Sequence, residues 1–193
     1  MSSHRQYAVA TPPAVEPISL DEAKDHLRID GDVEDALLGR LIKAARQRIE
    51  QTTSRAMIST GMTLRLRSWY FNHVEFMRPL PVQSVTSVVY VDAAGDEQTL
   101  SADDYLVQTG DDASIWSRDD AWPQVGDVRW PVTISYVAGY GDSGDDVPEP
   151  LRQAILLTLG DLYRWRESTV GFQTHTVSLG ASQLAHPYRV VPT

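Results

Sequence analysis

The sequence contains no cysteine among its 193 residues. This absence excludes disulfide bonds, thiol nucleophiles, zinc ribbons and iron–sulfur ligation together. It is also compatible with synthesis in a reducing cytoplasm, where disulfide bonds are rare.

Long apolar runs are missing as well. No stretch approaches eighteen uninterrupted apolar residues, so the sequence predicts no membrane-spanning helix. The first residues, MSSHRQYAVATPPAVEP, lack the apolar core of a secretory signal. We therefore expect residues 1–16 to form a flexible N-terminal arm.

A concentrated basic patch is the third absence. The chain carries 17 Lys and Arg against 26 Asp and Glu, a formal net charge of −9, and its cations are spread without a block of five. Proteins that hold DNA tightly usually present a basic face to the phosphates. Two interpretations remain: no contact with nucleic acid, or an acidic surface past which nucleic acid slides without sticking.

Helical patterns lie near both ends of the sequence. Ser19 and Glu22 form a capping-box pattern that predicts a helix over 19–28. Asp32 offers a second cap, and apolar residues at helical spacing from Val33 to Ile49 predict a helix over 33–52. Prolines open a third apolar segment, which predicts a helix over 150–167.

Between the helices, residues 61–140 contain short runs rich in Val, Thr, Tyr and Trp that are separated by turn residues. Their spacing favours hairpins of an antiparallel sheet over βαβ units. The predicted strands are 62–67, 73–77, 82–91, 105–108, 113–117 and 132–137.

The last segment, 168–193, has weak periodicity but holds aromatic, Arg and Pro residues, as expected for an arm that folds onto a partner. Within it, 174–179 alternates like a strand. The sequence thus predicts an α+β fold. Residues 17–167 form a bundle of about three helices with the β-rich antiparallel insertion, and 168–193 form an extended C-terminal arm.

Catalytic patterns are weak. Gly141-Asp142-Ser143-Gly144 matches four letters around a serine-protease nucleophile, but no histidine stands in the usual context, so a Gly/Ser/Asp turn explains it better. The five histidines show no paired spacing, and the repeated Asp-Asp pairs lack the pattern of a calcium loop. We expect no catalytic residues, no metal and no cofactor.

The candidate binding residues are aromatic, Arg and Pro side chains toward the C-terminus. A cluster at 163–166 favours a protein interface, because Trp, Tyr and Arg are enriched at binding hot spots, although stacking on nucleic acid is the alternative. The candidates for contact with a larger partner or a neighbouring subunit are Tyr163, Arg164, Trp165, Arg166, Leu184, Pro187, Tyr188, Arg189 and Val190.

Three stretches in order resemble the head–tail connector (adaptor, or head-completion) family of tailed bacteriophages and gene transfer agents. They are Glu16 to Arg28 with the Leu-Ile-x-Ala-Ala-Arg core at 41–46, Leu80 to Val85 running into Tyr90, and Ser135 to Gly141 leading into the helix with Gln153-Ala154-Ile155. The terminal Pro187-Tyr188-Arg189 also resembles the ending of many members.

The resemblance implies a non-enzymatic structural subunit that is made in the host cytoplasm and ends in the virion neck. Such proteins form a homo-oligomeric ring, usually of twelve subunits, beneath the portal protein. The ring extends the DNA channel, in which DNA passes without sequence-specific binding, and it docks a stopper or tail-completion protein below. The family's C-terminal arms commonly fasten to the portal, which suggests this role for 170–193.

Three other functions stay open at this point. A stopper or tail-completion protein of the same particle is the alternative. A small hydrolase that uses Ser143 and a free nucleic-acid-binding module are the remaining hypotheses.

Overall fold

The structure, a computed structural model, describes residues 4–69, 72–76, 78–119, 121–164 and 179–190. It divides into two compact units. Among the described residues, the β unit holds 4–13 and 59–140 and the helical unit holds 14–58 and 141–190. The β unit includes residues 61–140, the segment in which the sequence predicts the β-rich insertion.

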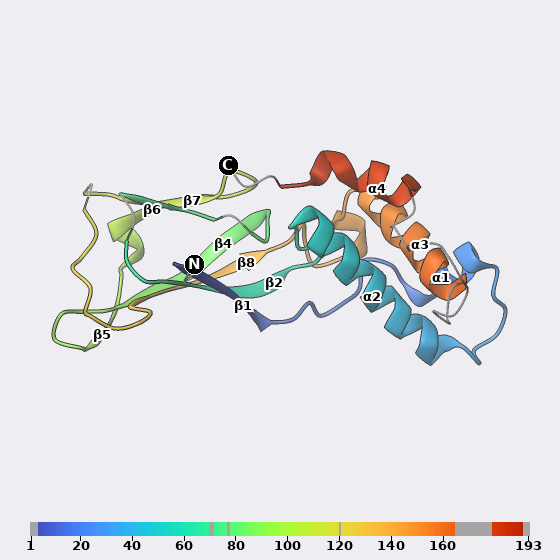
Figure 1. The fold of residues 1–193 in the computed structure, drawn as a ribbon, viewed down its shortest axis with the longest axis horizontal. Coiled ribbons are helices and arrows are strands. Elements are labelled where there is room, and N and C mark those ends of the chain that lie inside the picture. The colour runs from blue at the N-terminus through green and yellow to red at the C-terminus, as the bar shows by residue number, and fades with distance from the viewer. Residues whose placement is uncertain (1–3, 70–71, 77, 120, 165–178, 191–193) are drawn as a thin grey trace, which may run out of the picture. The chain divides into compact units, whose positions relative to one another are not determined.

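The helical unit contains four α-helices within the described residues, one more than predicted (Figure 1). They are α1 (Leu20–Leu27), α2 (Asp35–Thr53), α3 (Glu149–Arg164) and α4 (Leu179–Ala185). Leu38, Ile42 and Ile49 on α2 are fully buried, as are Leu151 and Ile155 on α3. This shared apolar face is what holds the helices together.

The predicted capping box of α1 is confirmed. The Ser19 hydroxyl accepts a hydrogen bond from the Glu22 amide at 3.1 Å, and the Ser19 amide donates to the Glu22 carboxylate at 2.8 Å. The helix ends at Arg28, which adopts a left-handed conformation with φ of 57°.

The predicted start of the second helix is wrong by two residues. α2 begins at Asp35, and its N-cap is Glu34, which makes no side-chain cap. The carbonyl of Asp32 instead accepts the Asp35 amide in the preceding turn. Val33 is consequently 95% exposed and lies outside the apolar face.

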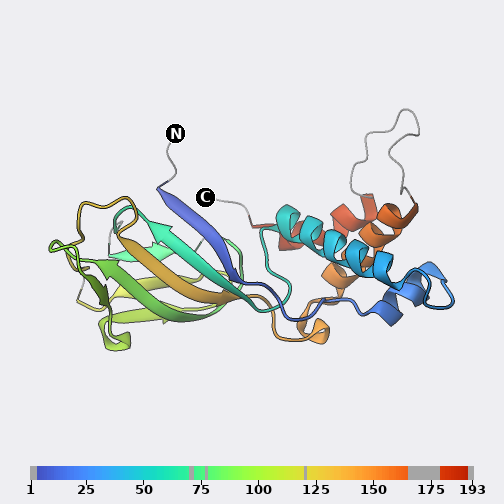
Figure 2. The ribbon, with the colours of Figure 1, turned by 90° about the horizontal axis from the view of Figure 1, so that it is seen from below.

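The β unit contains two antiparallel sheets (Figure 2). The larger has the strand order β1-β2-β8-β4-β5, and the smaller has the order β3-β7-β6. The strands are β1 (Arg5–Thr11), β2 (Thr60–Leu66), β3 (His73–Glu75), β4 (Val82–Val91), β5 (Glu97–Thr99), β6 (Tyr105–Gln108), β7 (Ser114–Ser117) and β8 (Val132–Ala138).

The core of the β unit is built from rows of apolar residues that face each other across strands. Leu64 on β2 pairs with Ile134 on β8, which pairs with Val88 on β4, and all three are fully buried. The rings of Phe76 and Tyr136 lie 4.8 Å apart between their centroids. Alternation along β2 and β8 places every second residue in this core.

The N-terminal segment departs from the predicted flexible arm. Residues Arg5–Thr11 form β1, which pairs with β2 from Arg5↔Leu66 to Val9↔Met62 (Figure 2). The alternation Gln6-Tyr7-Ala8-Val9 is too short and too weakly apolar to stand out as a strand in the sequence. The segment becomes a strand because it pairs with β2, which lies some fifty residues later in the chain.

The C-terminal segment also differs from the prediction of an extended arm. Residues 179–185 form α4, and His186–Tyr188 form a 3₁₀ turn, η3. Of the predicted strand 174–179, residues 174–178 lie outside the described residues. The prediction is wrong at Leu179, which begins α4. Ala181 and Ala185 are buried against the rest of the helical unit. Their small side chains allow α4 to pack closely there.

Candidate partner-binding site

A buried ion cluster fixes the frame of the helical unit. The Arg46 side chain on α2 is 5% exposed and contacts the Glu16 carboxylate at 2.7 Å and the Glu50 carboxylate at 2.6 Å. Glu50 also accepts the Met57 amide at 3.0 Å. The cluster therefore ties the segment before α1 and the segment after α2 to the same helix.

The cluster changes the proton affinities of its members. Burial lowers the pKa of Arg46, but hydrogen bonds and attraction from Glu16 and Glu50 outweigh it, so the net shift is upward. Burial raises the pKa of Glu50, and the neighbouring Arg46 only partly opposes this. The guanidinium therefore stays charged and holds the two carboxylates together.

The C-terminal segment, 179–190, is fastened to the end of α2. The buried Arg55 side chain, just beyond that end, donates from Nε to the carbonyl of Tyr188 at 2.5 Å. The Val190 amide donates to the carbonyl of Thr53 at 2.9 Å. Both bonds engage the backbone, so they hold the segment's path and leave its side chains available for contacts.

Five predicted site residues lie on this segment. Pro187 and Arg189 are exposed, and Leu184, Tyr188 and Val190 are half-buried. The fold therefore presents a proline and a guanidinium on a fixed backbone, with apolar side chains beneath them. Such a surface suits a protein partner, because Arg beside apolar side chains is frequent at binding hot spots.

The other predicted residues lie at the end of α3. The Tyr163 hydroxyl donates to the Glu34 carboxylate at 2.5 Å, and Arg164 is exposed. Trp165 and Arg166 lie outside the described residues. Tyr163 thus connects the end of α3 to the start of α2.

The structure does not bring the two predicted groups together. Tyr163 bonds to Glu34 at the N-terminal end of α2, whereas Val190 bonds to Thr53 at its C-terminal end. The 19 residues of α2 span about 28 Å at the usual rise of an α-helix. The two groups are consequently separate surfaces of one unit.

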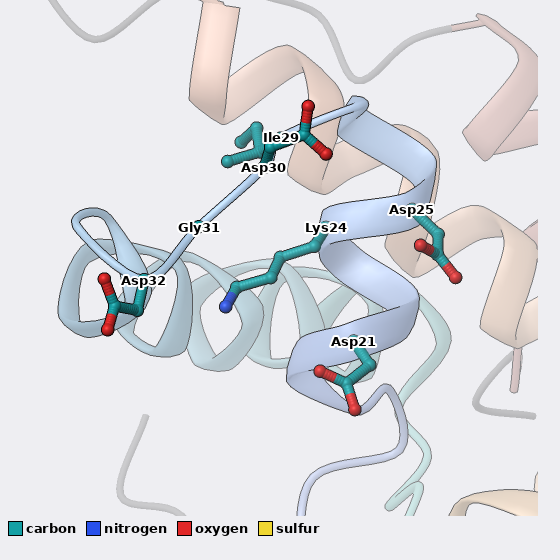
Figure 3. A pocket seen from close by; sticks show the side chains of 7 residues that line it. All are labelled: Asp21, Lys24, Asp25, Ile29, Asp30, Gly31 and Asp32. Atoms are coloured by element: carbon teal, nitrogen blue, oxygen red, sulfur yellow. The ribbon is translucent and has the colours of Figure 1, made fainter.

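An open acidic pocket lies beside α1 and the loop that follows it (Figure 3). Lys24 reaches from α1 toward the loop and forms an ion pair with Asp35 at 2.5 Å. The lining residues are Asp21, Lys24, Asp25, Ile29, Asp30, Gly31 and Asp32. With four carboxylates around one ammonium group, this surface repels phosphates.

Ser143 has a structural role in the turn before α3. Its hydroxyl accepts the Asp145 amide at 3.1 Å, and its own amide donates to the Asp146 carboxylate at 2.9 Å, so it caps the 3₁₀ turn η2 (Gly144–Asp146). A Cβ at position 141 would collide with the Asp146 side chain, which explains the glycine there. Neither hydrogen bond of Ser143 involves a histidine.

The described residues contain no group of three or more His, Asp or Glu side chains placed to hold a metal ion. Over the same residues, no helix is long and apolar enough to cross a bilayer.

Sequence reasoning missed an apolar row on the smaller sheet. Leu106 on β6 pairs with Trp116 on β7, which pairs with His73 on β3. The His73 and Trp116 rings stack at 4.3 Å, and both Leu106 and Trp116 are exposed. The apolar run Tyr105-Leu106-Val107 predicted a strand, but the sequence did not show which face of the smaller sheet would be covered by other residues.

Comparisons with known proteins point to one kind of assembly. A family model described as "Phage gp6-like head-tail connector protein" matches residues 17–94. The comparison with curated proteins finds no match.

Among solved structures, similar chains come from the neck of an empty gene transfer agent (GTA) particle computed with C6 symmetry, with a TM-score of 0.83, and from the virion of a native GTA particle, with a TM-score of 0.81. A third comes from the neck of a native GTA particle computed with C12 symmetry, with a TM-score of 0.77. Each is 27% identical to this chain. The matches cover 97–98% of this chain and 96–97% of the other chains.

Proposed function

We propose that this chain, which matches the family model of head–tail connector proteins over residues 17–94 and chains of gene transfer agent necks over nearly its whole length, is the adaptor of a phage or gene transfer agent neck. In this role it forms a ring under the portal protein, extends the DNA channel and docks the next neck or tail protein.

The similarity over the whole chain is the observation that carries the proposal. The neck chains match nearly the full length of this chain in both units, at 27% identity. A shared helical bundle alone would match only the helical unit. The match over both units therefore supports the same role and not merely a common module.

The symmetry of those necks supports a ring of twelve copies. One matching neck was computed with C6 symmetry and the other with C12 symmetry. Sixfold symmetry is contained within twelvefold symmetry, so a ring of twelve satisfies both descriptions. Repetition of modest contacts around a closed ring then gives a stable assembly.

The two separate surfaces of the helical unit suit two kinds of neighbour. We assign the exposed side chains of the C-terminal segment, Pro187 and Arg189, to the portal contact. We assign Tyr163 and Arg164, at the other end of α2, to a neighbouring subunit. The backbone bonds that hold the C-terminal segment reduce the entropy that docking would otherwise cost.

The acidic balance of the chain fits a conduit for DNA. With a net charge of −9 and the carboxylates around Lys24, the surface offers phosphates little to bind. DNA passes such a wall without sequence-specific contacts and with a short residence time.

The test is imaging of purified particles by electron cryomicroscopy, with the chain identified by a C-terminal tag. We expect a ring of this chain directly beneath the portal. A ring located lower, against the tail, would identify a stopper or tail-completion protein instead. Absence of the chain from the neck would reject the proposal.

A charge reversal tests the portal contact. Arg189→Glu should reduce the number of heads that carry the ring by about tenfold or more, because a reversed charge at a contact opposes binding. Arg40→Glu, on an exposed position of α2, is the matched control and should leave ring recruitment unchanged. Equal recruitment by both variants would contradict the assignment of Arg189.

A further inference from the structure

The two edges of the five-stranded sheet carry opposite charge. Three arginines lie at the β1 edge. Arg5 is the first residue of β1, Arg65 lies on the neighbouring β2, and Arg67 follows the end of β2; Arg65 and Arg67 are exposed. The Arg67 amide donates to the carbonyl of His4, so the cations lie together at one end of the paired strands. Glu75 is the nearby acidic residue, since its backbone carbonyl accepts from Arg5 at 2.6 Å.

The opposite edge is acidic. β5 and the turn before it expose Asp96 and Glu97, and the 3₁₀ turn η1 (Ala102–Asp104) that follows adds Asp103 and Asp104. Arg118 is the cation on this side, and its side chain donates to the backbone carbonyl of Asp103 at 2.8 Å. Carboxylates therefore dominate this edge.

β1 is built to accept another strand. Within the residues that the structure describes, it pairs with β2 on one side and ends the sheet on the other. Val9 faces the same side as the buried Met62, its partner on β2, yet it is 60% exposed. After Arg5 the strand contains no charged residue and no Pro, the residues that usually protect an edge strand from pairing, and its register shift lies near its end, between Val9 and Thr11.

From these features we propose that neighbouring copies of the chain join head to tail through this sheet, with the β1 edge of one copy against the β5 edge of the next. The inference rests on the proposed ring and names the contact that closes it. Different edges meet in such a contact, which is the heterologous type that generates closed rings.

The strand directions define the geometry of the contact. All neighbours in the order β1-β2-β8-β4-β5 are antiparallel, so β1 and β5 run in the same direction. A head-to-tail contact therefore pairs β5 with β1 of the next copy in parallel. Pairing of β1 with β1 about a two-fold axis would be antiparallel and would offer the cations of either copy no acidic counterpart, which the opposite edge supplies.

Cysteine cross-linking tests the contact directly, because the chain has no natural cysteine. Gln6, Arg65, Thr133, Val89 and Thr99 lie in one row across the sheet. Four strand spacings separate Gln6 from Thr99, roughly 19 Å. This exceeds the Cα separation of a disulfide, so cysteines at these positions of one copy cannot join each other.

The cross-linking variants are Gln6→Cys with Thr99→Cys and, to allow for a shift in register, Ala8→Cys with Thr99→Cys. They replace the natural chain in cells that assemble the particle, and purified necks are oxidised. At least one pair should give a ladder of covalent oligomers up to the complete ring. Dimers from Gln6→Cys alone or from Ala8→Cys alone, at the centre of β1, would show β1–β1 pairing and overturn the proposal.

The smaller sheet provides the matched control. Glu75 and Gln108 stand at its two edges, in one row through Ser114, and both are exposed. Glu75→Cys with Gln108→Cys should leave the chain monomeric on denaturing gels. An equal ladder from this pair would overturn the proposal.

Charge exchange gives an independent readout. Arg65→Glu with Arg67→Glu, or Asp96→Lys with Glu97→Lys, should each lower the cross-linking yield about tenfold or more, because like charges then face each other. The variant with all four substitutions has both edges reversed and should recover the yield. Failure to recover in a folded chain would overturn the role of the charges.

The outcomes separate this inference from the proposed function. If imaging shows the ring at the neck and neither cysteine pair gives a ladder, the sheet contact is wrong and the adaptor role stands. If imaging shows no ring, the adaptor role itself is wrong.

Discussion

The helical unit and the β unit use their charged residues differently. In the helical unit, carboxylates and guanidinium groups tie together segments far apart in the chain, such as Glu16 with Arg46 and Glu22 with Arg152. In the β unit, the apolar rows hold the sheets, and the charges gather at the sheet edges. Ion pairs therefore join distant segments of the helical unit, whereas the charges at the sheet edges of the β unit are exposed.

The largest expected effect tests the apolar rows of the β unit. Ile134→Ala should lower the free energy of unfolding by about 4 kcal/mol, because it leaves a cavity between Leu64 and Val88. Denaturant unfolding followed by the fluorescence of the stacked Trp69–Trp122 pair measures it. Val128→Ala, at an exposed position, should stay within about 0.5 kcal/mol. A small effect of Ile134→Ala would contradict the described core.

The next prediction compares a buried arginine of the helical unit with an exposed arginine of the β unit. Arg46→Ala should cost about 3 kcal/mol, because it leaves Glu16 and Glu50 partly buried without a cation. Arg65→Ala, the exposed counterpart in the β unit, should cost less than about 0.5 kcal/mol in the isolated chain. Thermal unfolding followed by helical circular dichroism compares them. Equal losses would remove the distinction between the two units.

A smaller effect compares two equivalent caps. Ser101 and Ser143 each form a capping box with an Asp three residues later, one in each unit. Ser101→Ala and Ser143→Ala should each cost about 1 kcal/mol, since a lost N-cap has that effect. Chemical denaturation measures both variants. If only Ser143→Ala abolished a hydrolytic activity, a catalytic role for Ser143 would replace the structural one.

The smallest effect is a pH dependence in the helical unit. Burial opposes ionisation of Glu22, but hydrogen bonds from Ser19 and the nearby Arg152 outweigh it, so the pKa of Glu22 lies below its ordinary value of 4.5. Its ionised form stabilises the fold above that value, and this contribution is lost as the pH falls through the lowered pKa.

Glu22→Gln should therefore reduce the loss of stability between neutral and acidic pH. Melting temperatures at several pH values would show it, with Asp25→Asn, at an exposed position of the same helix, as the control. An unchanged acid dependence would contradict the role of Glu22.

The sequence predicted those elements whose signals are local. The Ser19–Glu22 cap lies within one turn, and the strand Val82–Val91 is marked by a long β-branched run, so both agree with the structure. β1 and α4 were missed because each depends on packing against distant segments. Val33 looked like part of the apolar stripe, but the turn at Asp32 leaves it in solvent.

The candidate site was less accessible to sequence reasoning. Tyr163 and Val190 have suitable side chains, but no sequence pattern shows that they stand at opposite ends of α2. Arg46 and Arg55 are also indistinguishable from surface arginines in the sequence. Their partners, Glu16 and the Tyr188 carbonyl, lie 30 and 133 residues away and meet them only in the folded unit.

The short bridge between Ile58 and Gly141 has a consequence for how such proteins diversify. It holds the two points where the chain leaves and rejoins the helical unit side by side. Hairpins between these points can lengthen, shorten or change sequence over evolutionary time without altering the helical scaffold. The β unit can thus change in sequence and length while the helical unit keeps its packing.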